Sequence, residues 1–325
     1  MEDSFHRQID YLRISVTDRC NLRCRYCMPA DGVHLKTHEE ILSLEEIFRL
    51  VEVAVSLGFT KFRLTGGEPL VRKGLVSLVE RMVSLDGVRD ITMTTNGILL
   101  PQYAGELKKA GLKRVNISLD TLKKDRFAYI TRIGQIERVY QGIEASLEAG
   151  LKPVKINVVV VRGFNDDEIL DFAHLTRERP LHVRFIELMP IGESDGTAVQ
   201  KYVPVEEIKE ILSRHDELLP AQVEGSGPAD YVRLPESQGT IGFIGALSRH
   251  FCSTCNRLRL TAEGKLRPCL QKDVEFDLRT LLRQGVDQGV LRSVFLKALE
   301  QKPERHNMEI DGWGQQKRIM SQIGG

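Results

Sequence analysis

Six cysteines are the residues of this sequence most suited to chemistry, and they fall into two groups of three. The first group, Cys20, Cys24 and Cys27, has the spacing C-x3-C-x2-C and directly follows an expected strand at residues 11–17. Thiolates are soft ligands that favour iron–sulfur clusters or zinc. Three thiolates on a four-iron cluster leave one iron without a protein ligand, and that iron can bind a small molecule. The motif therefore predicts a cluster with an open coordination position.

The second group consists of Cys252, Cys255 and Cys269, with the spacing C-x2-C-x13-C. It again supplies three ligands, whereas a structural zinc site has four. The alternative for either group is a zinc site completed by another residue, such as His34 for the first group or His250 for the second. A closed zinc site would normally show a second C-x2-C pair. The sequence therefore favours a second open cluster.

Composition limits the classes to which this chain can belong. Its 325 residues are 42% hydrophobic, and 46 Lys and Arg balance 45 Asp and Glu, which argues against a general nucleic-acid binder. The amino-terminus lacks the pattern of a secretory signal, and no stretch of 18 apolar residues predicts a membrane span. We therefore expect a cytoplasmic protein, in which clustered cysteines serve as metal ligands rather than disulfides.

The elements that must position these cysteines alternate between strands and helices from residue 11 to about 215. The expected strands are Tyr11–Thr17, Phe59–Thr65, Val88–Thr95, Leu112–Leu119, Pro153–Val160 and Leu181–Glu187. Between them lie amphipathic helices, one of which begins after Ser43, with Glu46 completing a capping box. This order predicts parallel β-α-β units. Six units are too few for a closed eight-stranded barrel, which leaves an open, partial (β/α)6 barrel or a doubly wound sheet.

A change of composition suggests where this α/β region ends. The segment at 220–240 is rich in Gly and Pro. We expect residues 1–220 to form the α/β domain, and residues 221–325 to form a carboxy-terminal region that carries the second cysteine group, two short strands and two helices.

Several of the expected strands carry cations on one face. Arg63 shares a face with Lys61 in the second strand, as Lys155 does with Asn157 in the fifth, and Arg13 lies opposite the apolar face of the first strand. The alternative for any one strand is an antiparallel sheet with its polar face in water. Several such strands in a parallel pattern instead predict a basic cavity, suited to an anionic substrate.

The first cysteine group resembles the signature of the radical S-adenosylmethionine (radical SAM) family, with Tyr26 just before its last cysteine. The run TGGEP at 65–69 is similar to that family's GGE motif, and glycines there let the backbone approach a ligand. The resemblance implies a [4Fe-4S] cluster whose open iron binds S-adenosylmethionine. Reductive cleavage of that cofactor gives a 5′-deoxyadenosyl radical that abstracts hydrogen.

The whole chain from about residue 12 to 325 closely resembles the molybdenum-cofactor biosynthesis protein A family, which are GTP 3′,8-cyclases. The resemblance is carried by SVTDRCNLRCRYCMP, RLTGGEPLVR, TTNG, NISLD, KINVVV, RFIELMP, CSTCNRLRLTAEGKLRPCL and a terminal Gly-Gly. It implies a partial (β/α)6 barrel of the radical SAM type, similar to a TIM barrel, with a carboxy-terminal extension that holds a second [4Fe-4S] cluster. The implied reaction, of the lyase class, removes hydrogen from C3′ of GTP and joins C3′ to C8, giving 3′,8-cyclo-7,8-dihydro-GTP.

The resemblance also implies roles for individual residues. The expected S-adenosylmethionine contacts are Tyr26, Gly66, Gly67, Glu68, Ser118, Arg184 and Met189. The expected GTP contacts are Arg13, Lys61, Arg63, Thr94, Lys155, Arg257 and Arg259, and paired guanidinium–phosphate bonds give a reason for the arginines. Arg257 and Arg259 are further expected to act in catalysis, together with Cys20, Cys24 and Cys27. Gly324 and Gly325, which would otherwise be a frayed end, are expected to enter the active site.

The resemblance extends to partners. It implies GTP as substrate, an electron donor of the flavodoxin or ferredoxin type, and transfer of the product to cyclic pyranopterin monophosphate synthase. It implies no nucleic acid and no membrane, and it leaves a homodimer open. Two rival functions are another radical SAM enzyme with an auxiliary cluster and a zinc-containing nucleic-acid-binding module. The first would usually have more cysteines downstream, and the second would have a basic surface.

Overall fold

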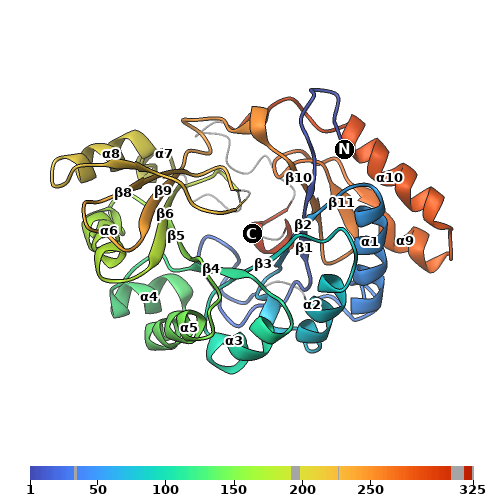
Figure 1. Cartoon of the computed structure of the whole chain (residues 1–325), viewed down its shortest axis with the longest axis horizontal. Coiled ribbons are helices and arrows are strands. Elements are labelled where there is room, and N and C mark those ends of the chain that lie inside the picture. The colour runs from blue at the N-terminus through green and yellow to red at the C-terminus, as the bar shows by residue number, and fades with distance from the viewer. Residues whose placement is uncertain (33–34, 192–197, 226, 309–317, 324–325) are drawn as a thin grey trace.

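Six parallel strands form the centre of one continuous sheet in the computed structural model, and they lie side by side in chain order (Figure 1). They are β1 (Tyr11–Ser15), β2 (Lys61–Thr65), β3 (Asp90–Thr95), β4 (Arg114–Ser118), β5 (Val154–Val160) and β6 (Leu181–Glu187). The structure describes residues 1–32, 35–191, 198–225, 227–308 and 318–323. Each of the six strands falls within the range expected from the sequence.

Helices cover the outer, convex side of this curved sheet (Figure 1). They are α1 (Leu44–Ser56), α2 (Leu75–Val83), α3 (Leu100–Lys109), α4 (Lys124–Thr131), α5 (Ile136–Glu148), α6 (Ile169–Glu178) and α8 (Val205–Ser213). The capping box expected at the start of α1 is present, with Ser43 and Glu46 each bonding the other's backbone N–H. The apolar face of every strand packs under these helices, as with Leu12 and Ile14 of β1, which are fully buried.

Strands from the carboxy-terminal third extend the sheet at both ends. At one end β9 (Thr240–Ile244) runs parallel to β6, followed by antiparallel β8 (Asp230–Arg233) and β7 (Leu219–Ala221). At the other end β10 (Arg257–Leu260) runs parallel to β1, followed by antiparallel β11 (Lys265–Arg267) and β12 (Phe276–Asp277). The sheet curves without its ends β12 and β7 pairing. The expected partial barrel is confirmed, whereas the division at residue 220 stays a prediction.

Two further helices, α9 (Leu278–Arg283) and α10 (Gln288–Glu300), pack against β11 at the β10 end of the sheet, and the short α11 (Met320–Ile323) follows near the end of the chain. The α10 helix packs beside α1, where Phe295 meets Phe59 edge to face with ring centroids 5.9 Å apart. Part of the expected loop at 190–203 is helical, because Ala198–Lys201 forms the single turn α7. None of the helices that the structure describes is both long enough and apolar enough to cross a membrane.

Candidate functional site: two cysteine sets around one cavity

The loop after β1 brings the first cysteine set to the rim of a large cavity on the concave side of the sheet. Cys20, Cys24 and Cys27 all line this cavity. The loop is turned by a bond from the Cys27 N–H to the Cys24 carbonyl (2.9 Å), and the Leu22 N–H points at the Cys20 sulfur (3.4 Å). Burial raises the pKa of the Cys27 thiol to about 12. A metal centre is therefore needed to keep these buried sulfurs as thiolates.

The turn after β2 is fitted closely against this loop. A methyl group on Gly67 would lie 2.3 Å from the Arg19 carbonyl oxygen, so only glycine lets the two backbones approach. Gly66 and Gly67 both line the cavity. Glu68, in contrast, is fully buried behind its wall, where it accepts bonds from Thr95 Oγ1 and the Asn96 N–H, both at 2.7 Å. Burial raises the pKa of Glu68 to about 7.

Asp120 is a cavity residue that the sequence reasoning missed. The Tyr26 hydroxyl donates to Asp120 Oδ2 (2.7 Å), and the Val159 N–H donates to Asp120 Oδ1 (2.9 Å). Burial raises the pKa of this carboxyl. A signal was available, because Asp120 closes the run NISLD and follows Ser118 by two residues, so both reach the same end of β4.

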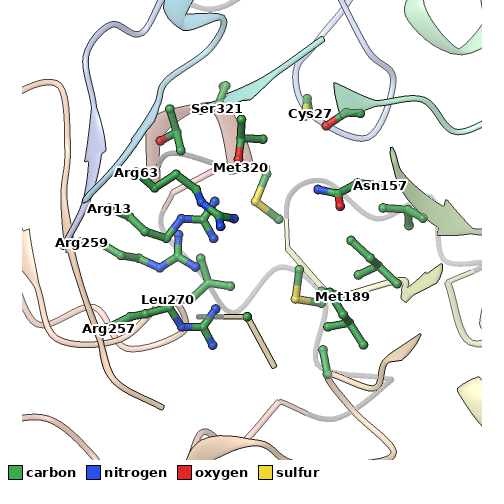
Figure 2. Close-up of a pocket in the computed structure, with 18 of the residues that line it drawn as sticks. Arg13, Cys27, Arg63, Asn157, Met189, Arg257, Arg259, Leu270, Met320 and Ser321 are labelled. Carbon is green, nitrogen blue, oxygen red and sulfur yellow. The ribbon is translucent and has the colours of Figure 1, made fainter. Parts of the chain in front are cut away.

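The side of the cavity around β5 and β6 carries the other expected cofactor contacts. Ser118, Arg184 and Met189 line the cavity, as expected. Arg184 donates through Nε (2.9 Å) and Nη2 (2.5 Å) to Asn157 Oδ1, which also lines the cavity. Figure 2 shows Asn157 and Met189 facing a group of arginines across the open space.

The second cysteine set lines the same cavity. Cys252 and Cys255 flank a single helical turn, closed by a bond from the Cys255 N–H to the Cys252 carbonyl (3.1 Å), and Cys269 follows β11. All three line the cavity. Burial alone would raise the pKa of Cys255, but Arg257 and Lys302 outweigh burial and lower it to about 6. This sulfur is therefore held as a thiolate near neutral pH.

Arginines from three adjacent strands form a row on the cavity wall. In register, Arg13 of β1 lies between Arg259 of β10 and Arg63 of β2, and all three line the cavity (Figure 2). Arg257 extends the row toward Cys255, with its guanidinium 5.1 Å from the Phe251 ring centroid. Burial, followed by repulsion from Arg259 and Arg63, lowers the pKa of Arg13 well below its usual range. A row of this kind can bind an anion with several charges.

Not every expected contact lies on the cavity wall. Thr94 does, whereas Lys61 instead pairs with Asp10 (2.7 Å), and Lys155 donates to the Glu224 carbonyl (2.6 Å). Gly324 and Gly325 lie outside the described residues. The chain nevertheless reaches the cavity just before them, since Met320 and Ser321 of α11 line it (Figure 2).

Two histidines far apart in sequence meet beside Cys252. His250 Nδ1 and His306 Nε2 are 3.4 Å apart, and together with the Cys252 sulfur they form a trio of ligand atoms within 4.8 Å of one another. The Met308 N–H donates to His306 Nδ1 (3.3 Å), which leaves the proton of the neutral ring on Nε2, facing His250. Neither set of three cysteines brings its sulfurs together as closely as this trio does, which is the only such group within 4.8 Å among the described residues.

Two family models together match nearly the whole chain. Residues 14–176 match the radical SAM superfamily, and residues 181–308 match Molybdenum Cofactor Synthesis C. The chain is 60% identical over 328 residues to the GTP 3′,8-cyclase of Moorella thermoacetica. It is 56% identical over 327 residues to the GTP 3′,8-cyclase of Heliobacterium modesticaldum. Both matches cover 100% of this chain and 100% of the relative.

The fold also matches a solved structure. SuiB of Streptococcus suis, in a crystal structure with bound S-adenosylmethionine, superposes with a TM-score of 0.60. The match covers 88% of this chain and 68% of SuiB, at 16% sequence identity. At that identity the likeness concerns the fold alone.

Proposed function

Because this chain belongs to the GTP 3′,8-cyclase family of radical SAM enzymes, we propose that its cavity converts GTP into 3′,8-cyclo-7,8-dihydro-GTP for molybdenum cofactor biosynthesis. The observation that carries this proposal is the shared wall of the cavity, where both cysteine sets and the arginine row face one space. A radical made at one cysteine set can reach a substrate held at the other only if both open into the same enclosure.

Cys20, Cys24 and Cys27 are proposed to hold the [4Fe-4S] cluster of the radical SAM reaction. When bound, this cluster supplies the electron that cleaves S-adenosylmethionine to methionine and a 5′-deoxyadenosyl radical. The residues proposed to bind S-adenosylmethionine lie around this set: Tyr26, Gly66, Gly67, Ser118, Arg184 and Met189. Glu68 is proposed to position the cysteine loop from outside the cavity. It accepts a bond from the Asn96 N–H, and the Asn96 side-chain amide donates to Asn21 Oδ1 (2.7 Å) in that loop.

The rest of the cavity is proposed to hold GTP. Arg13, Arg63 and Arg259 would bind the triphosphate, with Lys61 and Lys155 joining them if their present partners are exchanged for phosphate oxygens. Cys252, Cys255 and Cys269 are proposed to carry a second [4Fe-4S] cluster, whose open iron would bind the guanine base. In this binding mode the ribose, which joins the base to the triphosphate, would face the first cysteine set.

Three further proposals rest on family membership. The electron donor is proposed to be of the flavodoxin or ferredoxin type, and the product is proposed to pass to cyclic pyranopterin monophosphate synthase. Gly324 and Gly325 are proposed to act inside the cavity that Met320 and Ser321 already line.

Anaerobic reconstitution tests the proposed function. After loading with iron and sulfide, we expect about eight irons per chain, from two four-iron clusters. Incubation with S-adenosylmethionine, a reductant and GTP is expected to release 5′-deoxyadenosine and consume GTP. Protein that cleaves S-adenosylmethionine but leaves GTP unchanged would contradict the substrate assignment and leave the radical SAM assignment standing.

A further inference from the structure

Lys302 is a buried lysine that lies directly behind the second cysteine set. It follows the end of α10 by two residues, and only 3% of its surface is exposed. Its ammonium donates to the Arg257 carbonyl (2.8 Å), to the Pro268 carbonyl (2.9 Å) and toward the Cys255 sulfur (3.5 Å). The ammonium thus contacts a proposed cluster ligand directly.

The two carbonyls belong to the two separate segments that carry the cluster ligands. Arg257 lies two residues after Cys255 at the start of β10, and Pro268 immediately precedes Cys269 after β11. One ammonium therefore joins Cys255 and Cys269 through backbone groups next to each of them. Without it, two carbonyls would lose a donor in a buried region, which is unfavourable.

The charge of Lys302 also needs an explanation, because a buried ammonium requires an anionic partner. Carbonyl dipoles supply only part of what water would supply. The Cys255 sulfur, 3.5 Å from the ammonium nitrogen, would be that partner when it binds a cluster as a thiolate.

The segment that follows Lys302 is anchored to the third ligand. Arg7 is buried against Asp3, with a 2.7 Å ion pair between them. Its Nη1 donates to the carbonyls of Cys252 (2.8 Å) and Glu304 (2.9 Å), and its Nη2 donates to the Pro303 carbonyl (2.7 Å). Residues 302–304 are thereby linked to all three cysteines of the second set. These bonds hold the backbone next to Lys302 in place relative to the second set.

We propose that Lys302 is a positioning residue of the second cysteine set: it holds Cys255 and Cys269 at cluster-binding separation and places a positive charge against the Cys255 sulfur. This inference rests on the proposed second cluster. It has two consequences. The second cluster assembles only when the bonds that join the two carbonyls are intact, and its reduction potential is raised, because a nearby cation stabilises the more negative, reduced form.

The test compares two substitutions at this position with a matched control. Lys302→Met removes the hydrogen bonds and the charge, whereas Lys302→Gln removes the charge and the contact with the Cys255 sulfur but keeps an amide donor for the two carbonyls. Lys297→Met is the control, since Lys297 is an exposed lysine on α10 five residues earlier. Each protein is reconstituted anaerobically, and we measure iron per chain, the EPR signals of both clusters and the midpoint potential of the second.

We expect Lys302→Met to lose about half of its iron, as one four-iron cluster of two is lost, while the first cluster still assembles and cleaves S-adenosylmethionine. Lys302→Gln is expected to assemble both clusters, with the second reduced at a lower potential than in the wild type. The control should match the wild type in both measurements.

Other results overturn the inference in distinguishable ways. Normal loading and an unchanged potential in both Lys302 variants would show that the lysine does not act on the second set, while the proposed function stands. Loss of both clusters, with unfolding, in both variants would show a general folding role instead. If the wild type itself binds only one cluster, the proposed second cluster fails, and the role of Lys302 fails with it.

Discussion

The arginine row is the residue-scale feature that most restricts what the cavity can bind. Like charges held side by side on adjacent strands repel each other. Arg13 lies beside both Arg259 and Arg63 in register, so the row contains two such pairs. Burial, followed by repulsion from Arg257, lowers the pKa of Arg259 to about 10. A bound polyanion removes this repulsion, which explains why three cations occupy one row.

Substituting one member of this row should weaken GTP binding. We expect Arg63→Met to lower the affinity for GTP roughly ten- to a hundredfold, because a hydrogen bond between charged groups contributes about 1.5–3 kcal/mol. Isothermal titration calorimetry on the reconstituted protein measures the change. Arg214→Met is the control, since Arg214 is largely exposed at the end of α8. Equal affinities in the wild type and Arg63→Met would contradict a triphosphate site at the row.

Lys155 should make GTP binding depend on pH. Burial, followed by repulsion from Arg184 and Arg114, lowers the pKa of Lys155 to about 7. A triphosphate beside it favours the ammonium, so above pH 7 binding takes up a proton and affinity falls as pH rises. We expect a fall of up to about tenfold per pH unit between pH 7 and 9.

The matched variants for this prediction are both lysine-to-methionine changes. Lys155→Met should bind GTP more weakly at pH 7 and lose the dependence attributed to proton uptake. Lys109→Met, at an exposed position of α3, should keep it. Titrations in two buffers of different ionisation enthalpy report the proton uptake directly, and an identical pH profile in Lys155→Met and the wild type would rule out this lysine as its source.

At the scale of elements, some of the strands that build the site could be predicted from the sequence and others could not. The six central strands were predicted because each is a run of five or more residues rich in β-formers, and the runs recur between amphipathic helices. β10 was missed although Arg257 and Arg259 were singled out, because it has four residues and becomes a strand by pairing with β1 from far along the chain. Tertiary pairing of this kind leaves no local pattern.

Only part of the site could be predicted, for a similar reason. The cysteines and the glycines stand in local motifs, so the resemblance of those motifs to a known family could assign them roles. Lys302 and His306 were not found as site residues, because packing brings them to the cavity wall from far along the chain. A lone lysine after a helix gives no signal in sequence, and His250 and His306 are 56 residues apart.

The contact between the turn after β2 and the cysteine loop gives an element-scale prediction. Gly67→Ala would place its methyl group 2.3 Å from the Arg19 carbonyl oxygen, so the loop that carries Cys20 must shift. We expect the first cluster and S-adenosylmethionine binding to be lost. Iron analysis and equilibrium dialysis with S-adenosylmethionine measure this.

Gly105→Ala is the control for that change. Gly105 lies inside α3, and a methyl group there would meet nothing within 4 Å. It should keep the first cluster and raise the free energy of unfolding by about 0.5–1 kcal/mol, because alanine is the better helix former. If Gly67→Ala loaded its cluster as well as Gly105→Ala does, the close fit would not be what positions the loop.

At the scale of the whole molecule, the order of strands explains why there is one cavity rather than two sites. The carboxy-terminal third adds β10 beside β1 and β9 beside β6, so it extends both ends of the sheet and bounds the concave space from two sides. Cys252 and Cys255 precede β10, and the row of arginines runs from β10 across β1 to β2. The second cysteine set is therefore carried to the first by the sheet itself.

The central claim is that a radical generated at the first cysteine set reaches a GTP molecule held at the second. Reconstituted protein incubated with S-adenosylmethionine, a reductant and GTP deuterated at C3′ tests it most directly, with mass spectrometry of the 5′-deoxyadenosine that is released. If the radical takes hydrogen from C3′, that 5′-deoxyadenosine carries one deuterium and is formed together with the cyclised nucleotide. Release of undeuterated 5′-deoxyadenosine, with the GTP recovered intact, would contradict it.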